Sequence, residues 1–313
     1  MTTATLLKEP LPVHPAPPRP RSAWSIGERS LGLLLLAPAI LLLALVVLYP
    51  VGRLVYASLW DMRLSGGAEA HFIGLRNYAD LLADVDVRHA ALNTLGYVIV
   101  TVPGALIVGV ALALVANLSW RVKWPVRLAL LLPWALPMSF SGLIFAWFFH
   151  TDFGVVNDLL RRLGMAPVSF LLSPTWSFVA VCLASIWKAS SFVALIVLAG
   201  LQTVPAELYQ AARLDGASRW AQFRHITLPL ITPSLAVAAI FRTLAALQTF
   251  DIPYAMTQGG PARSTETIAM LIQTNAIDYL DVGYASALAV LLFITSLCVS
   301  LLHLRRVYRE ASA

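Results

Sequence analysis

Charged side chains are scarce in this sequence. Asp, Glu, Lys and Arg make up 12% of the 313 residues, hydrophobic types make up 59%, and the mean hydropathy is +0.77. Soluble domains contain about twice that share of charged residues. The composition therefore excludes an ordinary soluble enzyme and an intrinsically disordered chain, and we expect lipid to be the solvent for much of the protein.

Other absences exclude further classes of protein. The two Cys residues, Cys182 and Cys298, lie in apolar stretches, which excludes a disulfide scaffold. The 22 Lys and Arg residues form no basic run of the kind that binds nucleic acid. The sequence contains no G-x-x-x-x-G-K-[ST] phosphate loop, no His/Cys metal-ligand spacing and no nucleophile motif. We therefore expect no metal, no cofactor, no nucleic-acid partner and no catalysis in this chain.

Six apolar stretches are long enough to cross a bilayer, which takes about 20 residues of helix. With the N-terminus inside, most Lys and Arg residues outside the spans fall on the inner side, and these residues mark the cytoplasmic face. The sequence thus predicts an all-α, polytopic protein of the cell membrane with both termini cytoplasmic. The expected spans are 31–51, 92–116, 126–149, 176–201, 234–256 and 283–304.

The expected organisation is one membrane domain, 30–313, preceded by a tail. Residues 1–29 are rich in Pro and poor in apolar side chains, which is typical of a flexible segment. The loop 53–91 is long enough to contain short helices of its own.

The segment 203–233 has more helical signals than a passive loop needs. Gly216 is placed to end one short helix, since glycine adopts the left-handed cap conformation without strain, and Ser218 is placed to begin another. The remaining signals are Thr203 as a cap, Pro205 in the first turn, and Pro229 and Pro233 as interruptions before the next span. The sequence predicts a helix–turn–helix elbow.

Two short helices with an apolar face must bury that face in something. One alternative is packing under the membrane bundle, and the other is docking into a groove on a cytoplasmic protein. The residues alone leave both open. The side chains concerned are Leu208, Leu214, Trp220 and Phe223.

The elbow resembles the EAA loop of binding-protein-dependent ABC importer permeases. The shared pattern, starting at Glu207, is E-L-Y-x-A-A-R-x-D-G-A-S…F…I-T-L-P-L. Flanking segments are similar to the carbohydrate and glycerol-phosphate branch of that family, and the similarity covers nearly everything except the tail. These flanking segments are 72–78, 93–94, 198–202, 250–251, 259–261 and 283–287.

The resemblance implies the type I ABC importer permease fold and a translocation path for a sugar or glycerol-phosphate-like solute. It implies a second homologous permease, a dimer of cytoplasmic ATPase subunits holding ATP and Mg, an extracytoplasmic solute-binding protein and surrounding lipid. The elbow becomes the coupling helix, which sits in a cleft of the ATPase and moves with it. The implied coupling residues are Glu207, Leu208, Gln210, Ala211, Ala212, Asp215, Gly216, Ala217, Trp220, Phe223, Leu228 and Pro229.

Gln210 departs from the family pattern, which has a glutamate before the Ala-Ala pair. An amide forms hydrogen bonds but no salt bridge, so one ionic contact with the ATPase is in doubt. Glu207 lies one helical turn earlier and could replace part of that charge.

Lys188 and Arg242 are basic residues inside expected spans, where ionisable groups usually face a wet cavity or the interior of the bundle. Either could meet the solute; the alternative is a structural role, bonded to carbonyl groups or reaching the interface. Aromatic residues of span 126–149 are expected to pack, and those of span 234–256 could pack or bind. The expected path residues are Lys188, Gln248, Phe250, Asp251 and Tyr254.

A competing hypothesis is an autonomous secondary transporter or channel. It requires inverted repeats and intramembrane carboxylates, and the sequence shows neither. An intramembrane enzyme is disfavoured because no catalytic constellation is present.

Overall fold

The computed structural model describes residues 28–64, 69–118 and 124–311. The expected tail, 1–29, lies outside these ranges except for its last two residues. The chain divides into two compact units, 1–51 and 52–313, which are described separately.

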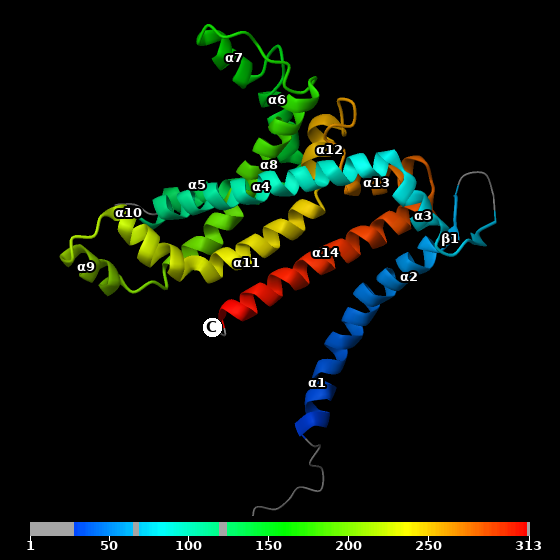
Figure 1. Cartoon of the computed structure of the whole chain (residues 1–313), viewed down its shortest axis with the longest axis horizontal. Coiled ribbons are helices and arrows are strands. Elements are labelled where there is room, and N and C mark those ends of the chain that lie inside the picture. The colour runs from blue at the N-terminus through cyan, green and yellow to red at the C-terminus, as the bar shows by residue number, and fades with distance from the viewer. Residues whose placement is uncertain (1–27, 65–68, 119–123, 312–313) are drawn as a thin grey trace, which may run out of the picture. The chain divides into compact units, whose positions relative to one another are not determined.

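The first unit contains one continuous helix. Helix α1 (Glu28–Leu43) passes through the π turn η1 (Ala44–Leu48) into α2 (Tyr49–Ser58), which extends into the second unit (Figure 1). The large apolar side chains of α1 and η1 are exposed. A helix of this length and composition suits a membrane span, and this agrees with the expected span 31–51.

In the described part of the second unit, the elements are helices and one short antiparallel pair of strands, β1 and β2, in which Trp60 pairs with Phe72 and Asp61 with His71. The hairpin is a local departure from the predicted all-α class, and the described fold is mostly helical. The elements of the second unit, after the end of α2, are β1 (Trp60–Asp61), β2 (His71–Phe72), α3 (Arg76–Ala83), α4 (Val85–Asn117), α5 (Trp124–Ala135), α6 (Met138–Phe148), α7 (Val155–Arg162), α8 (Pro174–Leu201), α9 (Ala206–Leu214), α10 (Arg219–Gln222), η2 (Phe223–Thr227), α11 (Leu228–Leu247), α12 (Asp251–Thr257), α13 (Ile268–Gln273), η3 (Thr274–Asp278) and α14 (Val282–Ala311).

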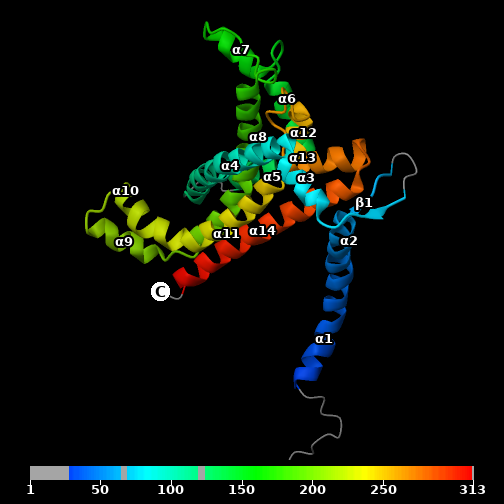
Figure 2. The ribbon, with the colours of Figure 1, turned by 45° about the vertical axis from the view of Figure 1, so that its right-hand side comes forward.

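Helices α4, α8 and α11 pack against one another and contain much of the core (Figures 1 and 2). Gly109 of α4 allows a close approach to α8, because a Cβ atom there would lie 2.5 Å from Cγ1 of Val193 and 3.0 Å from the carbonyl oxygen of Ser190 on α8. Small residues at such crossings let membrane helices approach closely. Buried apolar side chains surround the contact, including Val197 and Ile231.

Within the described residues, five helices are long and apolar enough to cross a membrane: 30–58, 85–117, 174–201, 219–247 and 282–303. The expected span 126–149 is not one of them, because it is broken into α5 and α6 at Leu136–Pro137. The proline ring disfavours helical geometry in the preceding residue, and proline has no N–H group to donate. The prediction of one unbroken helix over 126–149 was wrong.

The expected span 234–256 ends early, at Leu247. The carbonyl group of Thr249 accepts a hydrogen bond from the hydroxyl of Thr267 at 2.7 Å. That carbonyl is therefore bonded outside the helix, and the chain resumes as the separate short helix α12.

Pro229 and Pro233 do not interrupt the elbow's second helix, contrary to the sequence prediction. Helix runs unbroken from α10 through η2 into α11. The π turn η2 ends two residues before Pro229, and local π turns let a helix satisfy the backbone groups that a proline leaves without a partner.

Candidate coupling elbow and membrane cavity

The turn between α9 and α10 is closed by two backbone hydrogen bonds. The N–H of Ala217 donates to the carbonyl of Ala212 at 2.9 Å, and that of Gly216 donates to the carbonyl of Arg213 at 3.1 Å. This pair of bonds is the Schellman motif, and Gly216 has the left-handed φ of +76° that the motif requires. The predicted role of Gly216 in ending the first helix is confirmed.

For the elbow's two helices, the predicted start of the first is wrong and the predicted start of the second is confirmed. Thr203 is not a cap, since its hydroxyl donates back to the carbonyl of Gly200 at 2.9 Å. Pro205 occupies the N-cap position itself instead of the first helical turn. Ser218 does cap α10, where its Oγ accepts from the N–H of Ala221 at 3.2 Å.

Side-chain hydrogen bonds join the two arms of the elbow. The hydroxyl of Tyr209 on α9 lies 3.0 Å from Oγ1 of Thr227 in η2. Nε2 of Gln222 donates to the carbonyl of Ala217 at 2.9 Å. With the Schellman turn, these bonds make the elbow a rigid unit. These contacts were not predicted from the sequence, although Tyr209 is the tyrosine of the E-L-Y part of the motif.

The elbow buries no side chain of α9 or α10, two helices that lie wholly within the described residues. Leu214 is 90% exposed. Neither α9 nor α10 is therefore packed into the core of the described bundle. Among the predicted coupling residues, Ala212, Ala217 and Phe223 are half-buried, and the exposed ones are Glu207, Leu208, Gln210, Ala211, Asp215, Gly216, Trp220, Leu228 and Pro229.

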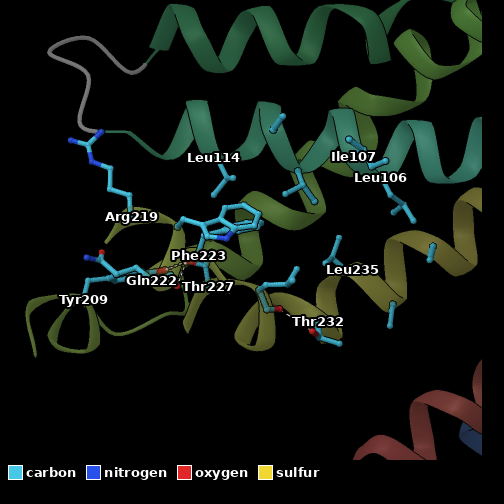
Figure 3. Close-up of a pocket in the computed structure, with 16 residues that line it drawn as sticks. Leu106, Ile107, Leu114, Tyr209, Arg219, Gln222, Phe223, Thr227, Thr232 and Leu235 are labelled. Atoms are coloured by element: carbon cyan, nitrogen blue, oxygen red, sulfur yellow. Dashed lines mark hydrogen bonds between the residues drawn. The ribbon is translucent and has the colours of Figure 1, made fainter. Parts of the chain in front are cut away.

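Trp220 and Phe223 line an open cavity of about 890 Å³ between the elbow, α11 and α4. Their rings lie 5.5 Å apart. Figure 3 shows Leu106 and Leu114 of α4 on one side of this cavity and Phe223 on the other (Figure 3). These two rings therefore face α4, although Trp220 is still 67% exposed.

A second cavity, of about 570 Å³, lies where the two broken segments meet. Leu136 and Pro137, at the α5–α6 break, line it together with Gln248 and Thr249, at the α11–α12 break. Non-helical backbone at membrane depth is tolerated only where it is buried in protein or lines a cavity. The breaks in the predicted spans 126–149 and 234–256 therefore both border this cavity.

Lys188 reaches from α8 to the end of α5. It is 5% exposed, and its Nζ donates to the carbonyls of Pro133 at 2.5 Å, of Trp134 at 3.1 Å and of Leu136. A helix leaves its last carbonyls without intrahelical donors, and an ammonium group has three protons to offer. The bonding of Lys188 to carbonyl groups, one of the two alternatives, is what the structure shows.

The other expected path residues are only partly brought together. Gln248, Phe250 and Asp251 line the cavity with Lys188, whereas Tyr254 does not. The ring of Tyr254 stacks on that of Phe250, with centroids 4.9 Å apart.

The path prediction omitted several residues that line the cavity. Tyr97 and Ser185 hydrogen-bond to each other through their hydroxyls, and Arg242 lies beside them. Trp134, expected to pack, is exposed and lines the same cavity. A basic residue inside a span was the only signal for Arg242; nothing in the local pattern marked Tyr97 or Ser185.

The segment that follows α12 is tied to the start of α4. Nδ2 of Asn93 donates to the carbonyls of Arg263 at 2.7 Å and Glu266 at 3.0 Å, and Arg263 forms ion pairs with Asp86 and Glu266. Burial by itself lowers the pKa of Arg263, but hydrogen bonds and charges of the two carboxylates outweigh it and raise that pKa. These contacts connect the motif segment 93–94 to the residues that directly follow the motif segment 259–261.

Comparison with known proteins places the chain in a family. The family described as "Binding-protein-dependent transport system inner membrane component" matches residues 105–308. The sulfoquinovosyl glycerol transport system permease protein SmoG of Agrobacterium fabrum is 55% identical, over 90% of this chain and 91% of that protein. The trehalose/maltose transport system permease protein MalF of Thermococcus litoralis is 35% identical, over 89% of this chain and 94% of that protein.

A solved structure shows the same fold. The crystal structure of a bacterial ABC transporter involved in the import of the acidic polysaccharide alginate has a TM-score of 0.76 at 23% identity, covering 89% of this chain and 95% of that one. The family resemblance, the type I importer permease fold and the separate ATPase expected from the sequence are thereby confirmed. The chain belongs to the binding-protein-dependent ABC importer permeases of the carbohydrate-uptake branch, as a multi-pass inner-membrane subunit that works with an ATP-binding ATPase and a periplasmic binding protein.

Proposed function

We propose that the elbow, residues 203–233, is the element through which the ATPase drives this permease. The observation that carries the proposal is the combination of a rigid turn with unburied side chains. Leu208 and Leu214 are exposed on α9, while the Gly216 turn and the Tyr209–Thr227 hydrogen bond fix α9 relative to η2. Since η2 continues directly into α11, a displacement of the elbow is transmitted to a membrane span.

The elbow and both termini lie on the cytoplasmic side in this proposal. The excess of Lys and Arg in the inner segments supports that orientation. The complete importer contains a second homologous permease and a dimer of ATPases. Docking of α9 into the ATPase gives its exposed apolar residues the partner that they lack within the described part of this chain.

The 570 Å³ cavity is the part of the translocation path that this subunit contributes. Its volume falls in the range of small-molecule sites. It combines the rings of Trp134 and Phe250 with the polar side chains of Gln248 and Asp251, a mixture suited to a sugar. Relatives are named for sulfoquinovosyl glycerol and for trehalose and maltose, and we assign a small glycoside of this kind to the cavity.

The test is uptake by the complete importer in proteoliposomes. Radiolabelled sulfoquinovosyl glycerol and trehalose are supplied with the binding protein on one side, and ATP is supplied on the side of the elbow. We expect accumulation of one of these glycosides only when ATP, the ATPase and the binding protein are all present. Accumulation against a gradient by complexes lacking the ATPase would contradict the proposal.

A further inference from the structure

Arg242 of α11 is a buried cation in the wall of the 570 Å³ cavity. It is 8% exposed. Its Nη2 donates to the hydroxyl of Thr101 at 2.8 Å, and the hydroxyl of Tyr97 lies next to the guanidinium group. Its Nε, also buried, has no hydrogen-bond acceptor among the residues that the structure describes. A charged group inside a membrane protein is costly unless it is paired, so this guanidinium is incompletely satisfied.

The other charged groups of the cavity do not pair with Arg242. The ammonium of Lys188 is directed to the carbonyls at the end of α5. The carboxylate of Asp251 accepts a hydrogen bond from Ser139 at 3.1 Å. Among the described residues, no carboxylate lies within the 4.0 Å of Arg242 that defines an ion pair. The cavity thus has two cations and one carboxylate.

We propose that Arg242 binds an anionic group of the transported glycoside: a sulfonate, carboxylate or phosphate. This inference rests on the proposed role of the cavity as the translocation path. The names of the relatives leave open whether the solute is charged, since one is named for a sulfonated glycoside and another for neutral disaccharides. A guanidinium that lines the cavity and has no carboxylate partner among the described residues selects the charged kind, because its planar N–H groups match the oxygens of an oxyanion.

The experiment measures glycoside binding to the purified permease–ATPase complex in nanodiscs by calorimetry, without the binding protein. The three probes differ in the group at one position of the sugar. Sulfoquinovosyl glycerol has a sulfonate there and glucuronosyl glycerol a carboxylate, whereas glucosyl glycerol has a hydroxyl group and is neutral. We expect the wild-type complex to bind an anionic probe at least tenfold more tightly than the neutral one. Comparing the two anionic probes identifies the acid.

Arg242→Gln should weaken binding of the anionic probe by about tenfold to a hundredfold, the usual effect of losing a charged hydrogen-bond donor, and leave the neutral probe unchanged. Arg242→Lys should retain part of the preference. Arg162→Gln is the matched control, since Arg162 is exposed on α7 and pairs only with Asp158 in the described structure.

Two outcomes would overturn the inference while leaving the path in place: equal binding of neutral and anionic probes by the wild type, or an equal loss for all probes in Arg242→Gln. The second outcome would mean that Arg242 only supports the fold, or that the second permease neutralises it. If the wild-type complex binds none of the glycosides, the assignment of the cavity as the path fails as well.

Discussion

Gly216→Ala should weaken the association of the permease with its ATPase roughly five- to thirtyfold. Nothing lies within 4 Å of the position of the added Cβ atom, so the substitution introduces no clash. Its entire effect comes from the φ of +76°, where an L-residue costs about 1–2 kcal/mol. Relief of that strain opens the turn and misplaces α9, so uptake and binding-protein-stimulated ATP turnover should fall together with the affinity.

The chain contains a matched control for this substitution. Gly164, after α7, has a φ of +74° and equally open surroundings. It closes the same kind of turn, in which its N–H donates to Arg161 at 3.0 Å and that of Met165 donates to Leu160 at 2.9 Å. Gly164→Ala therefore imposes the same local strain outside the elbow and should leave ATPase affinity unchanged. Equal effects of the two substitutions, or none from Gly216→Ala, would refute the elbow's role as a rigid lever.

Lys188→Met should destabilise the membrane domain by about 3 kcal/mol or more. Methionine has similar length but no donor, so the carbonyls of Pro133, Trp134 and Leu136 lose the partner that the structure shows. Each buried carbonyl left unpaired costs about 1–3 kcal/mol. The melting temperature of the purified complex should fall by roughly 10 °C.

Lys188→Arg provides the control, because a guanidinium retains several N–H donors for the same carbonyls. It should recover most of the melting temperature. If Lys188→Met melts like the wild type and only substrate affinity falls, the residue acts on the solute instead of on the α5–α6 break, and the structural assignment of Lys188 is wrong.

Local signals in the sequence predicted the turn of the elbow, although not the role of its prolines. The left-handed position of Gly216 and the cap at Ser218 follow from the chemistry of single residues in consecutive helices, and both are present. The span 176–201 likewise corresponds to α8 because a long apolar run needs no tertiary contact to become a membrane helix.

The breaks in two other spans could not be read from hydropathy. Leu136–Pro137 lies in a run as apolar as any span, and the break there is stabilised by Lys188, about fifty residues further along the chain. The break after Leu247 depends on the hydroxyl of Thr267. Conversely, Pro229 was expected to interrupt a helix and does not, because the π turn η2 accommodates it. Long-range hydrogen bonds and local changes of helix type decided each case.

Only part of the cavity lining was predicted from the sequence, because the rest depends on contacts between helices that are distant in the chain. Gln248 and Asp251 belong to one segment and were predicted together. Tyr97, Ser185 and Arg242 come from three different helices, α4, α8 and α11. Their proximity follows from how those helices cross, which the periodicity of a uniformly apolar helix does not encode.

The central claim, that the elbow touches the ATPase, is tested most directly by photo-crosslinking. A benzoylphenylalanine replaces Leu214, the 90% exposed residue at the end of α9, in the assembled importer; a second sample has it at Leu163, which is 70% exposed beside the equivalent turn of α7. After irradiation, mass spectrometry should identify an adduct with the ATPase at position 214 and none at 163. An ATPase adduct at 163 but not at 214 would contradict the account.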